Sequence, residues 1–268
     1  MKKQLWLYLI IVVGIFFYFG GVAQADIDPT TAQKLLSEDS NAISFGYSVS
    51  VSGNTAVIGN GGEAYVFTKS CPDSTTWQFQ QKLIPPEDNA DDGFETFSWF
   101  GEFVSIDGDT IIVGGGDRLE RGGNRVGYVP GACIYTRSGT AWELQQKISA
   151  YPPVDTDKRY DYVKSVVVDN DTAVVVIGSM YPVHRESTGN DYGIAYVFIR
   201  SGGVWTLQQE IIDPDPAEYS FGTSVALNGD TLLIGAALDD ENGGGFRLCL
   251  FLYPHRYLLA FTAEDSLS

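Results

Sequence analysis

The sequence is poor in the side chains that most often carry out nucleophilic, acid–base or metal chemistry. It holds only two histidines, His184 and His255, so a Ser-His-Asp triad or a histidine-based metal site has almost no material. Its three cysteines, Cys71, Cys133 and Cys249, follow no metal-ligand or redox spacing, and an odd count leaves at least one unpaired. We therefore predict no catalytic residues and no disulfide framework.

Basic side chains are scarce as well. The chain has 17 Lys and Arg against 34 Asp and Glu, which gives a formal net charge of -17. Such a surface repels phosphate backbones and anionic lipids, which argues against nucleic acid or a lipid surface as a partner. What the chain does have is 44% hydrophobic residues and 30 glycines, which indicates a globular, β-rich protein.

Residues 1–25 differ from the rest. Lys2 and Lys3 precede an apolar run from Leu5 to Val22, and Ala23-Gln24-Ala25 supplies small residues at a cleavage spacing, so we predict a signal peptide. The apolar run approaches the roughly 20 residues that cross a bilayer, so an uncleaved membrane anchor is the alternative. Either segment predicts a secreted, periplasmic or cell-surface protein.

A repeated β-hairpin accounts for residues 26–245. Its clearest copy, Phe221–Ala236, reads FGTSVALNGDTLLIGA, and further copies begin at Phe45, Phe100 and Tyr162. The threonine after each turn recurs at Thr55, Thr110, Thr172 and Thr231. These spacings of 55, 62 and 59 residues, each with four strand signals, indicate propeller blades. The predicted fold is an all-β propeller of four-stranded antiparallel blades, about four of which are present.

The strands within each unit have distinct patterns. The first strand alternates, the turn carries Gly or Asn for positive φ, and the second strand is apolar throughout. The fourth strand carries Trp77, Trp142 or Trp205 ahead of a Gln-Gln pair, and this recurrence favours packing between blades over a ligand platform. Gln33–Leu36 resembles an isolated fourth strand that completes the last blade, either in a closed four-blade ring or, as we prefer, in a fragment of a larger ring.

Residues 246–268 abandon the repeat. If the last two bases of each codon are read with the first base of the next, codons allowed for Leu259–Ser266 can encode Trp-His-Leu-Gln-Gln-Lys-Ile. The same shift over Phe246–Tyr253 permits Phe-Gly-Ser-Val-Tyr-Phe-Tyr, a third strand. We interpret this tail as a frameshift product and the propeller as truncated or incomplete.

The motifs FG, Ser-Val, Gly-Asp-Thr, Ile-Gly-Ala, Ala-Tyr-Val-Phe and Trp-x-Leu-Gln-Gln-Lys occur in one order, and residues 31–245 resemble the bacterial FG-GAP repeat family, related to the propeller head of α-integrins. This resemblance implies a secreted or surface propeller in which loops sometimes hold Ca²⁺. The second strands here end without the Gly-Ala-Pro typical of the family.

Calcium requires six to eight oxygen ligands, which favours loops dense in Asp and Asn. The predicted ligands are Asp88, Asp91, Asp92, Asp239, Asp240 and Asn242. The alternative is that these loops are solvated turns closed by Asx hydrogen bonds.

We predict a non-catalytic module that binds a protein or glycan through loops on one face, and the candidate segments are Asp117–Val129 and Tyr181–Asp191. The alternative is a carbohydrate-active enzyme with a carboxylate pair on the propeller face, about 5 to 10 Å apart.

The frameshift interpretation is tested by the nucleotide sequence of the gene. We expect the shifted frame to stay open beyond the codon for Ser268 and to encode further copies of the hairpin. A downstream frame without such copies contradicts the interpretation.

Overall fold

The computed structural model describes residues 32–37, 44–71, 74–86, 94–121, 124–149, 161–179, 193–212, 221–239 and 247–254. Residues 1–34 and 35–268 form separate units, and the account below concerns the second unit. Its described residues form strands and turns, and none of them belongs to a helix that could cross a membrane. The predicted signal segment lies outside the described residues.

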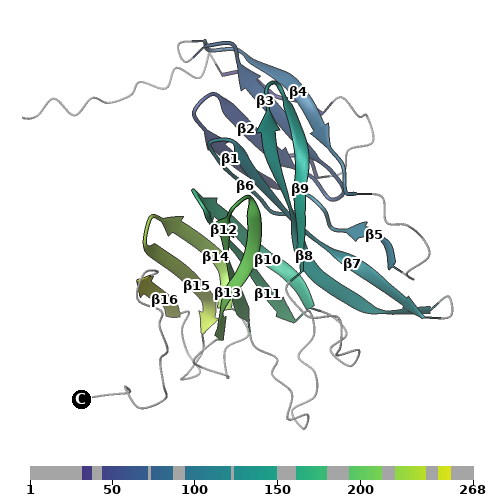
Figure 1. Ribbon diagram of the computed structural model, residues 1–268, viewed down its shortest axis with the longest axis vertical. Helices are drawn as coiled ribbons and strands as arrows, with labels where there is room; N and C mark the ends of the chain where they lie inside the picture. Colours follow the sequence, from purple (N-terminus) through teal and green to yellow (C-terminus); the bar gives the residue numbers. More distant parts are fainter. Residues whose placement is uncertain are drawn as a thin grey trace, which may run out of the picture. The chain divides into compact units, whose positions relative to one another are not determined.

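Four antiparallel sheets follow one another along the chain, and we call them blades 1 to 4 (Figure 1). Blade 1 holds β1 (Ser48–Ser52), β2 (Thr55–Gly59), β3 (Ala64–Lys69) and β4 (Trp77–Leu83). Blade 2 holds β5 (Phe94–Ser98), β6 (Val104–Asp107), β7 (Thr110–Arg121), β8 (Asn124–Ser138) and β9 (Ala141–Ser149). Blade 3 holds β10 (Asp161–Asp169), β11 (Thr172–Ser179), β12 (Ile194–Ser201) and β13 (Val204–Ile212). Blade 4 holds β14 (Phe221–Asn228), β15 (Thr231–Asp239) and β16 (Arg247–Pro254).

The predicted hairpin register is confirmed in every blade. The last residue of each first strand pairs with the repeated threonine, as Ser52 does with Thr55 and Asn228 with Thr231. The turn residue between them has positive φ, for example 52° at Asn170, which a tight hairpin requires. The second strand is apolar throughout because, in blades 2 and 3, a neighbouring blade lies against each of its two faces.

The hydrophobic core lies between the blades. Blades 1 and 2 enclose one cluster that contains Val57 and Ile111, and blades 2 and 3 enclose another that contains Ile134 and Val175. A third cluster joins blades 3 and 4. Successive residues of one strand point to opposite faces, so each strand serves two junctions at once.

Hydrogen bonds between first strands fix the register of neighbouring blades. Ser48 and Ser52 of blade 1 accept hydrogen bonds from the backbone N–H groups of Val104 and Gly108 in blade 2, both at 3.0 Å. The residue at the Ser52 position repeats this contact at each later junction. Asp107 accepts from Asn170 N at 2.7 Å, and Asp169 accepts from Gly229 N at 2.5 Å.

Hydrogen bonds between fourth strands form a second repeated contact, which we call the Gln–Trp bridge. Gln146 of blade 2 donates to Trp205 O at 2.8 Å and accepts from Trp205 N at 2.8 Å, while Gln145 accepts from the indole N–H at 2.9 Å. Gln80 and Gln81 bind Trp142 in the same way. The indoles of Trp142 and Trp205 are buried, so the prediction that they pack between blades is confirmed for both.

The segment Asp117–Val129, predicted to be a recognition loop, is instead largely strand. The prediction was wrong because β7 and β8 continue past the core of the blade, pairing as far as Arg121 with Asn124. β5 adds a third strand by pairing Phe94 with Leu119. We call this three-stranded extension the arm; Figure 1 shows β5 beside the distal part of β7.

Both chain ends differ from the predictions. Gln33–Leu36, predicted to be a fourth strand, lies within residues 32–37, which form no strand. Residues 247–254, predicted to lie outside the repeat, form β16 in the third-strand register, since the continuous apolar run Leu248–Tyr253 suits a strand. Within the described residues the sheets do not close into a ring, so the predicted incomplete propeller is confirmed.

The Gln–Trp bridge predicts a measurable stability difference between equivalent glutamines. Replacing Gln146 with Ala leaves two buried backbone groups of Trp205 without their side-chain partner, and we expect a loss of about 1–3 kcal/mol in the free energy of unfolding. The matched control is Gln209→Ala, at the same position of blade 3, where we expect a change within about 0.5 kcal/mol. Chemical denaturation of both variants measures the difference, and equal losses contradict the assignment.

Candidate functional site

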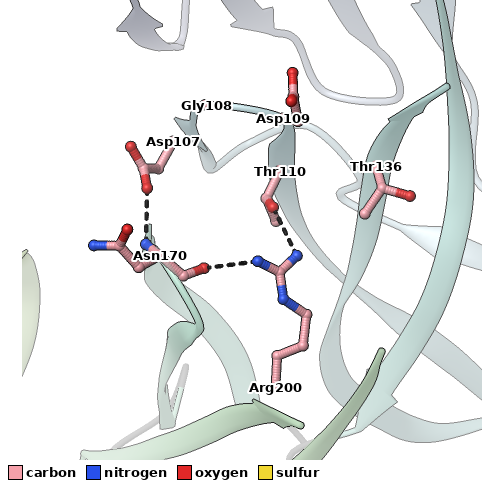
Figure 2. Close-up of a pocket in the computed structure, with 7 residues that line it drawn as sticks. All are labelled: Asp107, Gly108, Asp109, Thr110, Thr136, Asn170 and Arg200. Atoms are coloured by element: carbon pink, nitrogen blue, oxygen red, sulfur yellow. Dashed lines mark hydrogen bonds between the residues drawn. The ribbon is translucent and has the colours of Figure 1, made fainter. Parts of the chain in front are cut away.

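A cleft of about 420 Å³ lies between blades 2 and 3, at the end of the sheets that carries the tight turns (Figure 2). Its lining residues are Asp107, Gly108, Asp109, Thr110, Thr136, Asn170 and Arg200. They come from the turn between β6 and β7, the turn between β10 and β11, and the ends of β8 and β12. The cleft therefore combines carboxylate, hydroxyl and guanidinium groups from two blades.

Arg200 is the central group of this cleft. Its guanidinium donates to Asp171 Oδ1 at 2.6 Å, to Thr110 Oγ1 at 3.0 Å and to Asn170 O at 3.3 Å. It also lies 5.1 Å above the ring of Trp205, within cation–π range. Because Thr110 belongs to blade 2 and the other partners belong to blade 3, Arg200 fastens the two blades together.

The same arrangement recurs at the preceding junction. Arg137 of blade 2 donates to Thr55 Oγ1 of blade 1 at 2.6 Å, and its Nε lies 2.8 Å from Asp109 Oδ1. Its guanidinium lies 4.5 Å above the ring of Trp142. Exposed ion pairs contribute little by themselves, but the hydroxyl and ring contacts add direction. The charged groups of the cleft thus form a repeated lock between blades, and their hydrogen bonds compete with any ligand.

Sequence reasoning missed this lock, although the signal was present. A basic residue follows the third-strand aromatic by two positions in three units, at Lys69, Arg137 and Arg200. In blade 1, Lys69 Nζ likewise lies 4.8 Å above the ring of Trp77. A repeated cation at fixed distance from a repeated Trp indicates a structural pair.

Another titratable group, Glu102, lies near the start of the first strand of blade 2, at the opposite end from the tight turns that line the cleft. Glu102 follows the Phe-Gly pair of blade 2, and burial raises the pKa of its carboxyl. The pKa of the Tyr162 phenol is raised by burial first, then by the proximity of Tyr47 and Glu102. Residues from blades 1, 2 and 3 therefore converge here, which makes Glu102 a candidate for an acid that keeps its proton above the usual range.

Five of the six predicted calcium ligands lie outside the residues that the structure describes. Asp88, Asp91, Asp92, Asp240 and Asn242 lie outside the described residues, and Asp239 is described only as the last residue of β15. Within the part of the chain that the structure describes, no group of three or more His, Cys, Asp and Glu could hold a metal ion. The candidate segment Tyr181–Asp191 also lies outside the described residues.

The environment of Glu102 predicts a pH-dependent change in stability. A folded-state pKa raised above the unfolded value contributes stability at low pH, which is lost as pH rises through the folded value. We therefore expect Glu102→Gln to raise the midpoint of thermal unfolding at pH 7 and to leave it unchanged near pH 4. The exposed Glu143→Gln is the control, and an equal effect at both pH values contradicts the burial argument.

Comparison with known proteins adds a family match and distant structural likenesses. Residues 205–246, from the start of β13 into the segment after β15, match the FG-GAP repeat. Trypanosoma rangeli sialidase has a TM-score of 0.46 at 11% identity, over 81% of this chain and 38% of its own. Its complex with sialic acid has a TM-score of 0.42 at 13% identity, over 84% and 39%. A comparison with curated protein sequences gives no match.

This chain spans less than two fifths of the length of the sialidase, and likeness at these TM-scores does not transfer a function. The family match falls on blades 3 and 4, where the Trp-x-Leu-Gln-Gln motif of β13 and the FG hairpin of β14 and β15 lie. Residues 205–246 therefore match the FG-GAP repeat, which the motifs of the chain resemble, within an incomplete β-propeller.

Proposed function

We propose that the chain is a non-catalytic propeller module that binds a protein or glycan ligand through the arm. The observation that carries this proposal is the departure of blade 2 from the repeat. β7 has 12 residues and β8 has 15, whereas β2 and β3 of blade 1 have 5 and 6. Among the described residues, the junction clusters draw on β7 only as far as Val113 and on β8 only from Ala132 onward, so we assign the added length another role.

The arm also offers backbone groups for recognition. β8 pairs with β9 only from Gly131 onward, so Asn124–Pro130 has one ladder partner, β7, among the described residues. A strand with one open edge can take an extended peptide by main-chain pairing, while side chains supply specificity. The polar locks hold the blades in register behind it. This combination favours a rigid scaffold with a peripheral binding element.

Export is part of the proposal. The basic, apolar and small-residue pattern of residues 1–25 supports a secreted, periplasmic or cell-surface location, with the segment cleaved or kept as an anchor. Calcium bound in the Asp-rich loops would stabilise the propeller by holding several loop oxygen atoms around one ion.

The competing function is a carbohydrate-active enzyme. Glu102 favours it to the extent that a half-buried carboxyl with a raised pKa can serve as a general acid. Glycoside hydrolysis ordinarily needs a second carboxylate about 5 to 10 Å away, and Glu102 supplies one member of such a pair. Two phenols accompany Glu102 at this place, since Tyr47 and Glu102 both raise the pKa of Tyr162.

The arm proposal is tested by shortening the hairpin. Residues 118–128 are replaced by Asn-Gly, which joins Asp117 and Val129, a register pair, through a two-residue turn. We expect an unchanged unfolding midpoint and loss of binding to arrays of immobilised glycans and extended peptides. Retained binding contradicts the role of the arm. Release of product from any glycan by the intact chain, abolished in Glu102→Gln, favours the enzyme instead.

The calcium proposal is tested by thermal unfolding in Ca²⁺ and in chelator. When the free Ca²⁺ concentration is about 100 times the dissociation constant, binding stabilises the folded chain by about 2.7 kcal/mol. We therefore expect a higher unfolding midpoint in Ca²⁺ than in chelator. Replacing Asp88, Asp91 and Asp92 with Asn should remove the difference if the first loop holds the ion. An identical midpoint in both buffers argues for solvated turns.

A further inference from the structure

Blades 1 and 4, the first and last blades that the structure describes, each present a face whose equivalent is covered in blades 2 and 3. We call the side of a blade toward the preceding blade its leading face and the other its trailing face. On the leading face of blade 2, Val104 and Ile106 are 6% and 5% exposed because blade 1 covers them. The equivalent residues of blade 1, Val49 and Val51, are 67% and 63% exposed. The leading face of blade 1 is therefore an open apolar junction surface.

The glycine of the FG pair supports this assignment. A Cβ at Gly101 would meet Glu63 O of blade 1 at 2.1 Å, and one at Gly222 would meet Val176 Cγ1 of blade 3 at 2.0 Å. Both glycines have φ near +85° and lie directly against the preceding blade. Gly46 has φ of 90°, the same conformation, but nothing lies within 4 Å of its Cβ position. The space that a preceding blade fills elsewhere is open there.

One part of the missing neighbour is already in place. Leu83, in the last strand of blade 1, is buried in the cluster between blades 1 and 2. Leu35 follows Gln-Lys as Leu83 does, and it packs on the leading face of blade 1 against the cluster that contains Tyr65 and Phe67. Leu35 thus occupies the place of a fourth-strand residue. A blade that docks on this face needs to bring only three strands.

Blade 4 has the matching form. Its described strands number three, β14 to β16, and the equivalent of β4 is lacking among the described residues. On its trailing face Ser224, Ala226 and Asn228 are exposed. Ser224 stands at the position of Ser48, and Asn228 at the position of Ser52, Asp107 and Asp169. In blade 1, Ser48, Ser50 and Ser52 accept hydrogen bonds from the next blade. Blade 4 has an acceptor at the first and third of these positions.

We propose that blade 4 of one copy of this chain docks on the leading face of blade 1 of a second copy, in a head-to-tail assembly. Asn228 then accepts from Gly53 N–H and Ser224 accepts from Val49 N–H, repeating the contacts between blades 1 and 2. Leu35 of the second copy supplies the fourth-strand position. The partner is a second copy because one chain carries both mating faces. This inference is independent of the ligand-binding proposal.

The assembly is tested first by mass. Sedimentation of the purified chain at micromolar concentration should give two or more copies, since a blade junction is a heterologous contact that closes a ring or extends a filament. Val49→Asp with Val51→Asp places two charges in the junction and should give a single copy with an unchanged unfolding midpoint, because both side chains are exposed in one chain. Val204→Asp, on an exposed residue of β13, is the control and should assemble normally.

Cross-linking then distinguishes a second copy from closure within one chain. Ala226 and Val51 occupy the positions of Ser50 and Ile106, which are joined by a hydrogen bond of 3.1 Å. In a background with Cys71 and Cys249 changed to Ser, a mixture of V51C and A226C chains should form a disulfide between copies. The proposal is overturned if the wild-type chain sediments as one copy, if the Asp variant still assembles, or if only the doubly substituted chain cross-links, within itself.

Discussion

The structure depends on one constraint: each apolar second strand has two faces, and they belong to different junctions. β11 contributes Val175 to the cluster with blade 2 and Val174 to the cluster with blade 4. A single blade would expose both faces, and its four short strands could not offset the conformational entropy lost on folding. Stability therefore comes mainly from the contacts between blades. The first-strand acceptors, the Gln–Trp bridge and the Arg locks all lie at these contacts.

Polar side chains give these apolar junctions their register. A face of Val and Ile tolerates sliding, whereas a serine or aspartate oxygen that must meet one backbone N–H does not. The first strands are fixed by Ser52, Asp107 and Asp169, and the fourth strands by the Gln–Trp bridge. The cleft in Figure 2 is lined by residues that make these contacts between blades. Its residues have structural partners, which is why we place recognition on the arm.

The sequence predicted the repeat well and its exceptions poorly. Hairpin register, blade boundaries and buried tryptophans follow from local patterns, because glycine turns and period-two alternation are properties of a few adjacent residues. The arm does not, since Asp117–Val129 is rich in Gly and charge, and β5, its third strand, lies over twenty residues earlier. The lock of Arg137 and Arg200 joins residues about 80 to 90 positions apart, and only the fold brings them together.

The repeated contact of each first strand with the next has a consequence for how such proteins change in evolution. Each described junction includes the same contact: an oxygen in the last residue of one first strand accepts from a backbone N–H in the turn of the next blade. A duplicated copy of the gene segment for one blade therefore encodes both halves of a working contact, and its insertion requires no compensating substitution in its neighbours. Blade number can vary among descendants of one gene while every surviving boundary keeps its original chemistry.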